Sequence, residues 1–388
     1  MTKNSTKREE LKQRLNISYE YPVIFCHDIF APDNQILADL LSSSDKNIRA
    51  NIIVWFDNGL AVAQPSLIKK ARAWFNNQQN LNLKDISIYP GGEQVKDGFK
   101  YVEQMIAALK KNKICRKSFV IAVGGGAFLD ATGLAAALFH RGVRLLRLPS
   151  TVLSQNDSGV GVKNGINFSN VKNLLGVFAP PYAVVNDYDM LKSLPLFIMR
   201  DGLAEAFKVA IIKDPDFLDF LLKNADALKM GDAKALEFAI KQSATLHFNH
   251  IAQGGDPFEN GDARPLDFGH WAAHYLESMS GYELRHGQAV AIGVALDSAY
   301  AFYKGLINKN ELDSIINGLE RSGLSTWHEL LDKKEGSRPY VLNGIEEFRE
   351  HLGGKLAITL PDGIGSKIEV DAVNEDIMIK SIYYLRDR

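Results

Sequence analysis

Short apolar runs rich in β-branched residues alternate with amphipathic stretches through the first half of the chain. The runs typical of strands are Tyr21–Cys26, Asn51–Phe56, Ile86–Tyr89, Ser118–Val123, Arg144–Pro149 and Tyr182–Asn186. Helical patterns lie between them, at Ser66–Asn77, Asp97–Lys111 and Phe128–His140. Strands that are apolar throughout, rather than at alternate positions, are typical of a parallel sheet covered on both faces. The pattern therefore predicts an α/β domain.

The pattern changes in the second half, where the helical period dominates. The predicted helices are Gly202–Ile212, Phe217–Met230, Ala233–Gln253, His270–Ser280, Gly287–Lys304, Asn310–Ser322 and Ile345–Leu352. We place the domain boundary near residue 193, which gives an α/β domain over 1–193 and an all-helical domain over 194–388.

Composition narrows the class of protein. The 388 residues are 46% hydrophobic, and 45 basic side chains face 46 acidic ones, so no global field attracts nucleic acid or an anionic membrane. Cys26 and Cys115 are the two cysteines, which argues against a disulfide scaffold. Because no apolar run approaches the length of a bilayer crossing, we expect a soluble cytoplasmic protein.

Three glycines, Gly124, Gly125 and Gly126, separate a predicted strand from a predicted helix. Such a turn lets backbone N–H groups approach an anion at the positive end of the helix, as in dinucleotide binding. The spacing matches neither the Gly-x-Gly-x-x-Gly fingerprint nor a P-loop. Asp57, after the second strand, and Asp130, in the helix, suit ribose hydroxyls. Asp57 is equally suited to starting a turn, and Asp130 is equally suited to interacting with the helix dipole.

A long polar stretch, Ser150–Asn167, follows the strand that ends at Pro149. It combines hydroxyls, amides and glycines with Asp157 and Lys163, and Lys172-Asn173 continues the polar run. Segments of this kind at the edge of a sheet usually line a site for a polyhydroxylated or phosphorylated ligand.

Histidines are concentrated in the predicted helical half. His270 and His274 are four residues apart, so both project from one helix face, and His286 is a candidate third ligand for a zinc-like ion. Glu205 and Lys208 are three apart on another helix, where a solvated ion pair is the usual interpretation and a metal ligand beside a phosphate contact is the alternative. Isolated helical histidines are more often surface or capping residues.

Five motifs together resemble 3-dehydroquinate synthase and its sugar phosphate cyclase relatives. In chain order they are Gly124-Gly-Gly-x-x-x-Asp130, Asp157-Ser-x-Val-x-x-Lys163, Gly202-Leu-Ala-Glu205-x-x-Lys208, Phe268-Gly-His270-x-x-x-His274 and His286-Gly-x-Ala-Val-Ala-x-Gly293. The resemblance covers roughly residues 50 to 365.

The resemblance implies a Rossmann-like NAD-binding domain, a helical metal-binding domain, and a cleft between them holding NAD and one divalent metal, usually zinc, with cobalt as the alternative. Residues at the positions of the metal ligands are Glu205, His270 and His286. Those at the NAD positions are Asp57, Glu93, Lys96, Gly124, Gly125, Gly126, Asp130 and Thr151. Those at the substrate positions are Asp157, Lys163, Asn173, Lys208, Arg264, Asp267 and His274.

The implied activity is loss of phosphate from a seven-carbon sugar phosphate followed by ring closure, with NAD regenerated within the cycle. Arg141 matches an arginine that the family delivers to the phosphate across a dimer interface, so a homodimer is implied.

Two departures leave the sugar open. The segment Arg264-Pro-Leu-Asp267 is one residue shorter than the dehydroquinate synthase pattern and has an acid in place of an asparagine, and Asn249 or His250 stands where the family has a lysine. Both changes weaken binding of a substrate carboxylate. The sequence is therefore compatible with 3-deoxy-arabino-heptulosonate 7-phosphate, giving 3-dehydroquinate, and with sedoheptulose 7-phosphate, giving a valiolone-type cyclitol.

Two other functions fit parts of the pattern. An iron- or zinc-dependent polyol dehydrogenase of the glycerol type has the same glycine turn and a helical metal domain, but it needs no phosphate site. A non-catalytic nucleotide-binding descendant would keep the fold alone.

Overall fold

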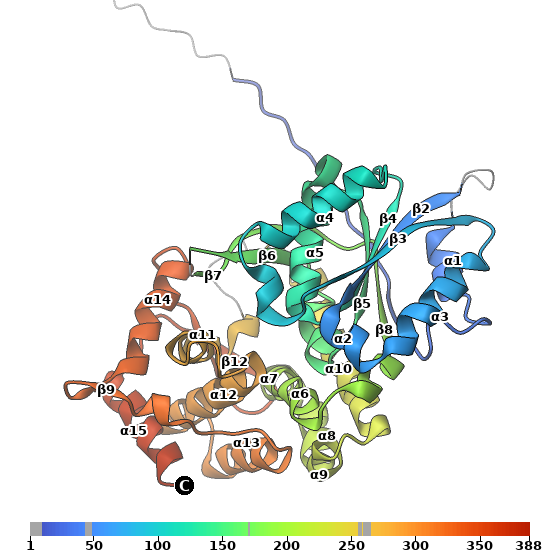
Figure 1. Ribbon diagram of the computed structural model, residues 1–388. Coiled ribbons are helices and arrows are strands. Elements are labelled where there is room, and N and C mark those ends of the chain that lie inside the picture. Colours follow the sequence, from blue (N-terminus) through green and yellow to red (C-terminus); the bar gives the residue numbers. More distant parts are fainter. Residues whose placement is uncertain (1–9, 43–48, 170, 255–257, 259–264) are drawn as a thin grey trace, which may run out of the picture.

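The computed structural model describes residues 10–42, 49–169, 171–254, 258 and 265–388 (Figure 1). A six-stranded sheet of order β1-β8-β5-β4-β2-β3 lies in the first half, and all its neighbouring strands are parallel. Its strands are β1 (Val23–Cys26), β2 (Ala50–Asp57), β3 (Leu81–Tyr89), β4 (Phe119–Gly124), β5 (Arg144–Pro149) and β8 (Ala183–Asp187). The predicted parallel α/β architecture is confirmed.

Helices cover both faces of this sheet. They are α1 (Ile36–Leu41), α2 (Asn58–Ala63), α3 (Pro65–Asn76), α4 (Lys100–Lys111) and α5 (Gly126–Leu138). Alternate side chains of β2 enter two separate cores, with Val54 in the cluster that includes Trp74 of α3 and Trp55 in the cluster that includes Met105 of α4. Both faces of β2 are buried, which explains why the strand is apolar throughout.

An antiparallel hairpin interrupts the order of the sheet. Strands β6 (Lys163–Phe168) and β7 (Val171–Phe178) pair with each other within the stretch between β5 and β8. The sequence predicted an irregular polar loop over Ser150–Asn167, continued by Lys172-Asn173, so both strands of the hairpin were missed. Side chains such as Lys172 and Asn173 are polar because of what they contact, which hides the strand pattern.

The second half is helical, as predicted. Its helices are α6 (Leu196–Asp201), α7 (Leu203–Lys213), α8 (Pro215–Lys223), α9 (Ala225–Lys229), α10 (Ala233–Gln253), α11 (His270–Met279), α12 (His286–Tyr303), α13 (Lys309–Arg321), α14 (Asn343–His351) and α15 (Glu375–Arg386). The stretch Phe217–Met230 forms two helices rather than one, because the chain leaves helical geometry at Asn224.

Several elements of this half were not predicted. They are α6, α15 and two antiparallel hairpins, formed by β9 (Lys334–Glu335) with β10 (Arg338–Pro339) and by β11 (Ile358–Pro361) with β12 (Lys367–Val370). The hairpins are two and four residues long per strand, too short for a hydrophobic period to reveal.

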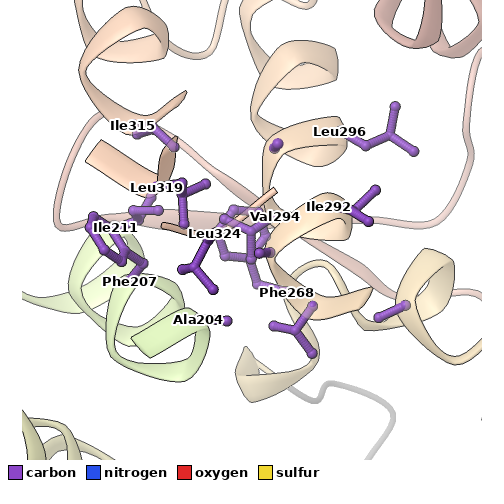
Figure 2. Close-up of a cluster of buried hydrophobic side chains, with 14 of the residues drawn as sticks. Ala204, Phe207, Ile211, Phe268, Ile292, Val294, Leu296, Ile315, Leu319 and Leu324 are labelled. Atoms are coloured by element: carbon purple, nitrogen blue, oxygen red, sulfur yellow. The ribbon is translucent and has the colours of Figure 1, made fainter. Parts of the chain in front are cut away.

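Helix α12 is at the centre of the helical core. Figure 2 shows Val294 of α12 in one cluster with Phe207 of α7 and Leu319 of α13, and all three side chains are fully buried. Burial of each such side chain contributes on the order of 2 kcal/mol. Within the described ranges, no helix has the length and apolar character needed to cross a membrane. The boundary near residue 193 stays a prediction.

Candidate active site

The glycine turn connects β4 to α5 at the carboxyl edge of the sheet. A Cβ atom on Gly124 would lie 2.5 Å from the Phe128 ring, and one on Gly126 would lie 2.5 Å from Ser158 Oγ. Gly125 is the residue before α5, and Thr151, after β5, lies beside it. The absence of side chains keeps backbone amides accessible at the positive end of a thirteen-residue helix.

Asp57 stabilises this edge from the end of β2. One carboxylate oxygen accepts a hydrogen bond from Leu60 N (3.1 Å) at the start of α2, and the other accepts one from Gly125 N (3.3 Å). The side chain is buried, and a Cβ atom on Gly91 would come within 2.7 Å of its carboxylate. Asp57 therefore caps helix α2, where a turn over Asp57-Asn58-Gly59 was the predicted alternative to a ribose contact, and a ribose contact would be an additional role.

Lys96, Asp130 and Asn173 form a second polar group near the turn. The Lys96 side chain is 2% exposed, and its Nζ lies 2.8 Å from Asp130 Oδ2 and contacts Asn173 Oδ1. Glu93 is more exposed and accepts a hydrogen bond from Asn167 Nδ2 (3.0 Å). Two residues predicted at the NAD site are thus joined to one predicted at the substrate site.

Glu205, His270 and His286 converge from α7, α11 and α12. Glu205 Oε1 lies 3.6 Å from His270 Nε2 and 3.5 Å from His286 Nε2, and it has no hydrogen-bond donor among the described residues. Two ligands bound to one tetrahedral zinc lie roughly 3.4 Å apart. A buried carboxylate oxygen without a donor, at this spacing from two imidazole nitrogens, therefore fits a divalent metal ion.

Glu277 orients His286. Its Oε2 lies 3.0 Å from His286 Nδ1, and its Oε1 lies 2.6 Å from Lys172 Nζ. Burial favours neutral His286, but the Glu277 and Glu205 carboxylates outweigh it and raise the pKa of His286 to about 9. Near neutral pH the raised pKa therefore keeps a proton on both ring nitrogens, and a metal ion must displace the Nε2 proton while the Nδ1 proton stays on the Glu277 side.

Buried polar contacts fix the start of α11. Gly269 has a left-handed backbone (φ 78°), and a Cβ atom there would lie 2.6 Å from Val294 N on α12. Asp297 of α12 is fully buried and accepts hydrogen bonds from Gly269 N (3.0 Å) and Trp271 Nε1 (2.8 Å). Burial raises the pKa of Asp297 to about 7, against the two hydrogen bonds. These contacts determine where His270 lies.

Lys208 joins the metal group to the polar loop. The 2% exposed side chain contacts Glu205 Oε2, and its Nζ lies 4.0 Å from Asp157 Oδ1. Burial acts to lower the pKa of Lys208, but Glu205 and Asp157 outweigh it and raise the pKa. The half-buried Asp267 adds negative charge to the surroundings of Lys208. A fixed cation beside a metal group is suited to binding an anionic or hydroxylated substrate.

His274 lies beside the metal group rather than in it. Its ring centroid is 5.3 Å from that of His270 and 5.9 Å from that of His286. His274, Glu277 and His286 are also close enough to hold an ion. However, both oxygens of Glu277 already have partners, whereas Glu205 Oε1 has no donor in the described chain. The Glu205 group is the better site.

Three predicted site residues remain, Arg264, Arg141 and Lys163. Arg264 lies outside the described residues. Arg141 follows α5 at the end opposite the glycine turn, about 20 Å along the helix, and is exposed. Lys163 begins β6 on the loop side, with an exposed side chain.

The sequence predicted no site role for His247 and Glu277, and it placed Lys172 in the polar run without a partner. His247 of α10 lies 2.8 Å from Asp157 Oδ1, and Lys172 and Glu277 are linked to His286. Glu277 had a visible signal, because it follows His270 by seven residues and so lies on the same helix face. The contacts of His247 and Lys172 had no such signal, since their partners are distant in the sequence.

Models of the 3-dehydroquinate synthase N-terminal and C-terminal regions match residues 86–201 and 202–340. The 3-dehydroquinate synthase of a Nitratiruptor species is 34% identical over 291 residues, covering 75% of this chain and 80% of the relative.

Two solved structures share the fold. The 2-epi-5-epi-valiolone synthase ValA from Streptomyces hygroscopicus subsp. jinggangensis 5008, with NAD⁺ and Zn²⁺ bound, has a TM-score of 0.86 at 24% identity and covers 97% of this chain and 99% of its own. A 2-deoxy-scyllo-inosose synthase complexed with carbaglucose-6-phosphate, NAD⁺ and Co²⁺ has a TM-score of 0.76 at 20% identity. The match covers 93% of this chain and 96% of the synthase. The family models and the curated relative decide between the alternatives in favour of a cyclase and against a polyol dehydrogenase or a non-catalytic protein. The chain belongs to the 3-dehydroquinate synthase family and is an enzyme of the sugar phosphate cyclase type.

Proposed function

We propose that this enzyme removes phosphate from a seven-carbon sugar phosphate and closes the product to a carbocycle, using NAD and one divalent metal ion. The observation that carries the proposal is Glu205 Oε1, buried without a hydrogen-bond donor in the described chain and 3.5–3.6 Å from two imidazole nitrogens. Lys208 and Asp157 lie beside it.

Glu205, His270 and His286 would hold the metal, with zinc favoured over cobalt because the set is one carboxylate and two imidazoles. ValA has Zn²⁺ bound, and the inosose synthase has Co²⁺. The metal would stabilise negative charge on a substrate oxygen, while NAD⁺ would take up and return a hydride. The two structures also contain NAD⁺.

The NAD site would be built at the carboxyl edge of the sheet. The backbone of Gly124, Gly125 and Gly126 would receive the pyrophosphate at the start of α5. The other residues of this site would be Asp57, Glu93, Lys96, Asp130 and Thr151.

The substrate would lie between the polar loop and the metal group. Asp157 would accept hydrogen bonds from ring hydroxyls, and His274 would exchange hydrogen bonds with them. Lys208 would place its charge close to the reacting oxygen. Lys163, Asn173 and Arg264 would bind the remaining polar groups. Arg141 is too far along α5 to reach its own site, so we propose that a second copy supplies it to the phosphate in a homodimer.

Asp267 favours a substrate without a carboxylate. It is an acid beside Lys208, and His250, near the position of the family's lysine, has its pKa lowered to about 4 by burial and by Lys213. His250 is therefore neutral at pH 7, and the Lys213 ammonium, whose Nζ lies 3.3 Å from His250 Nδ1, contributes to this. We favour sedoheptulose 7-phosphate. The 34% identity to a 3-dehydroquinate synthase supports 3-deoxy-arabino-heptulosonate 7-phosphate as the second candidate.

Phosphate release measured side by side with the two heptose phosphates tests the proposal. We expect faster release, at catalytic amounts of NAD⁺, from sedoheptulose 7-phosphate, with a cyclitol as product. Faster release from the heptulosonate would reassign the substrate. No release from either, by protein loaded with zinc and NAD⁺, would refute the proposed reaction.

A further inference from the structure

Two adjacent residues at the start of β7 connect the two cofactor sites proposed above. Lys172 Nζ lies 2.6 Å from Glu277 Oε1, and Glu277 contacts the proposed metal ligand His286. Asn173 contacts Lys96, which is paired with Asp130 at the proposed NAD site. Neighbouring residues of one strand thus contact opposite halves of the molecule.

The backbone around these residues is held in place. Asn173 has a left-handed backbone (φ 55°), and its N–H donates to Asn167 Oδ1 (2.9 Å). Asn167 in turn donates to Glu93 Oε2 and accepts from Gly98 N at its carbonyl oxygen. The hairpin is therefore fixed to the turn that carries Glu93 and Lys96, and its position depends on that turn.

Lys172 also has a direct contact to the same turn. Its Nζ is 3.7 Å from Glu93 Oε1, in addition to the shorter contact with Glu277. Glu93 is 43% exposed at the side chain whereas Glu277 is 4% exposed, so water screens the first contact and not the second. The main link to the NAD side is therefore through Asn173 and Lys96.

We infer that Lys172 and Asn173 couple binding of the dinucleotide to binding of the metal ion. The inference rests on the proposed function, because it takes both sites as given there. Dinucleotide contacts at Lys96 and Asp130 would fix the Lys96–Asn173 contact, and with it the hairpin. Lys172 would then stay on Glu277, which holds His286 in the orientation needed for metal binding. Each ligand must therefore tighten the other by the same factor.

Titration of metal-free protein with Co²⁺, in the presence and absence of saturating NAD⁺, measures this factor. We expect about fivefold to twentyfold tighter Co²⁺ binding with NAD⁺. The reciprocal titration, NAD⁺ with and without Co²⁺, should give the same ratio. Equal affinities in both arms, with both ligands bound, would overturn the coupling and leave the proposed function intact. If Co²⁺ does not bind at all, both fail.

Two variants test the route. Lys172→Met removes the contact with Glu277, and Asn173→Gly removes the contact with Lys96 while glycine accepts the left-handed backbone. Both should bring the ratio close to one, and Lys223→Met, which removes an exposed ion pair within α8, should leave it unchanged. A ratio that stays at the wild-type value in both hairpin variants would overturn the assignment. Because the two variants act at opposite ends, loss of folding in one leaves the other decisive.

Discussion

The glycine turn after β4 and the metal group of the helical half are built by opposite means. At the turn, side chains are absent, and a Cβ atom on Gly124 or Gly126 would collide with a neighbour at 2.5 Å. At the metal group, three charged or titratable side chains from three helices meet, and Glu205 and His270 are buried while His286 is half-buried. The first site is limited by space and the second by the cost of burying charge.

The contrast determines which substitutions damage each site. Added volume at Gly124 or Gly126 should harm the turn and spare the metal group. A change in charge or hydrogen bonding should harm the metal group and spare the turn.

The largest effect is expected for His270→Ala. Loss of one of three ligands should abolish stable metal binding and lower kcat by at least about 10³-fold. NAD⁺ affinity in the absence of metal should stay within about twofold of wild type. Metal content by elemental analysis and NAD⁺ titration check both parts, with His27→Ala on the opposite half as control. A variant that retains its metal would show that the ligand assignment is wrong.

Asp297→Asn should change how stability depends on pH. The folded-state pKa of Asp297 is about 7 against an unfolded value near 3.8, so the folded protein binds more protons between those pH values. Its contribution to stability is present at low pH and is lost as the pH rises through 7, by an amount on the order of 2–4 kcal/mol.

Urea unfolding at pH 5 and pH 8 measures that slope. The asparagine variant should lose less stability than wild type between the two, even though it lacks one acceptor for Gly269 and Trp271. Parallel losses in the two proteins would mean that Asp297 is ionised in the fold throughout the range.

Gly124→Ala and Gly125→Ala form a matched pair. The first places a Cβ atom 2.5 Å from the Phe128 ring and 2.8 Å from Asp57 Cβ, whereas the second meets its nearest atom at 3.5 Å. We expect Gly124→Ala to lower the free energy of unfolding by about 1–3 kcal/mol and Gly125→Ala to lower it far less. Chemical denaturation compares them, and equal losses would contradict the packing argument.

Asp267→Asn is the mildest change. Removing one negative charge near Lys208 should shift the ratio of kcat/KM values towards the carboxylate-bearing heptulosonate by about threefold to tenfold. The two phosphate-release assays give that ratio directly. An unchanged ratio would rule out Asp267 as a determinant of the substrate.

Local pattern predicted the local parts of this molecule. The bounds of β5 and α10 agree with the sequence to the residue, and the glycine turn lies between a strand and a helix as expected. Each of these features depends on neighbours in the chain, either on an apolar run or on positions that only glycine can occupy.

Contacts between distant segments were beyond the sequence pattern alone. Spacing suggested His270 with His274, with His286 as a candidate third ligand and Glu205 as an alternative. Only the family resemblance selected Glu205, His270 and His286 as one set. The pairing of Lys172 with Glu277 and of His247 with Asp157 joins residues about 90 to 105 positions apart, for which no periodicity exists. The β6–β7 hairpin was not predicted because side chains such as Lys172, which contacts Glu277, are polar.

The close contact of α11 with α12 also bears on how such enzymes diverge. Gly269 and Gly293 lie so close that a Cβ atom on Gly293 would come within 2.0 Å of the Gly269 carbonyl oxygen. Because the two backbones touch at these glycines, neither helix can slide along the other without bringing a larger residue into the contact. His270 and His286 therefore keep a fixed register. New substrates must then be acquired by replacing residues around an immobile pair of imidazoles, such as Asp267 two positions before that contact, and not by moving the pair.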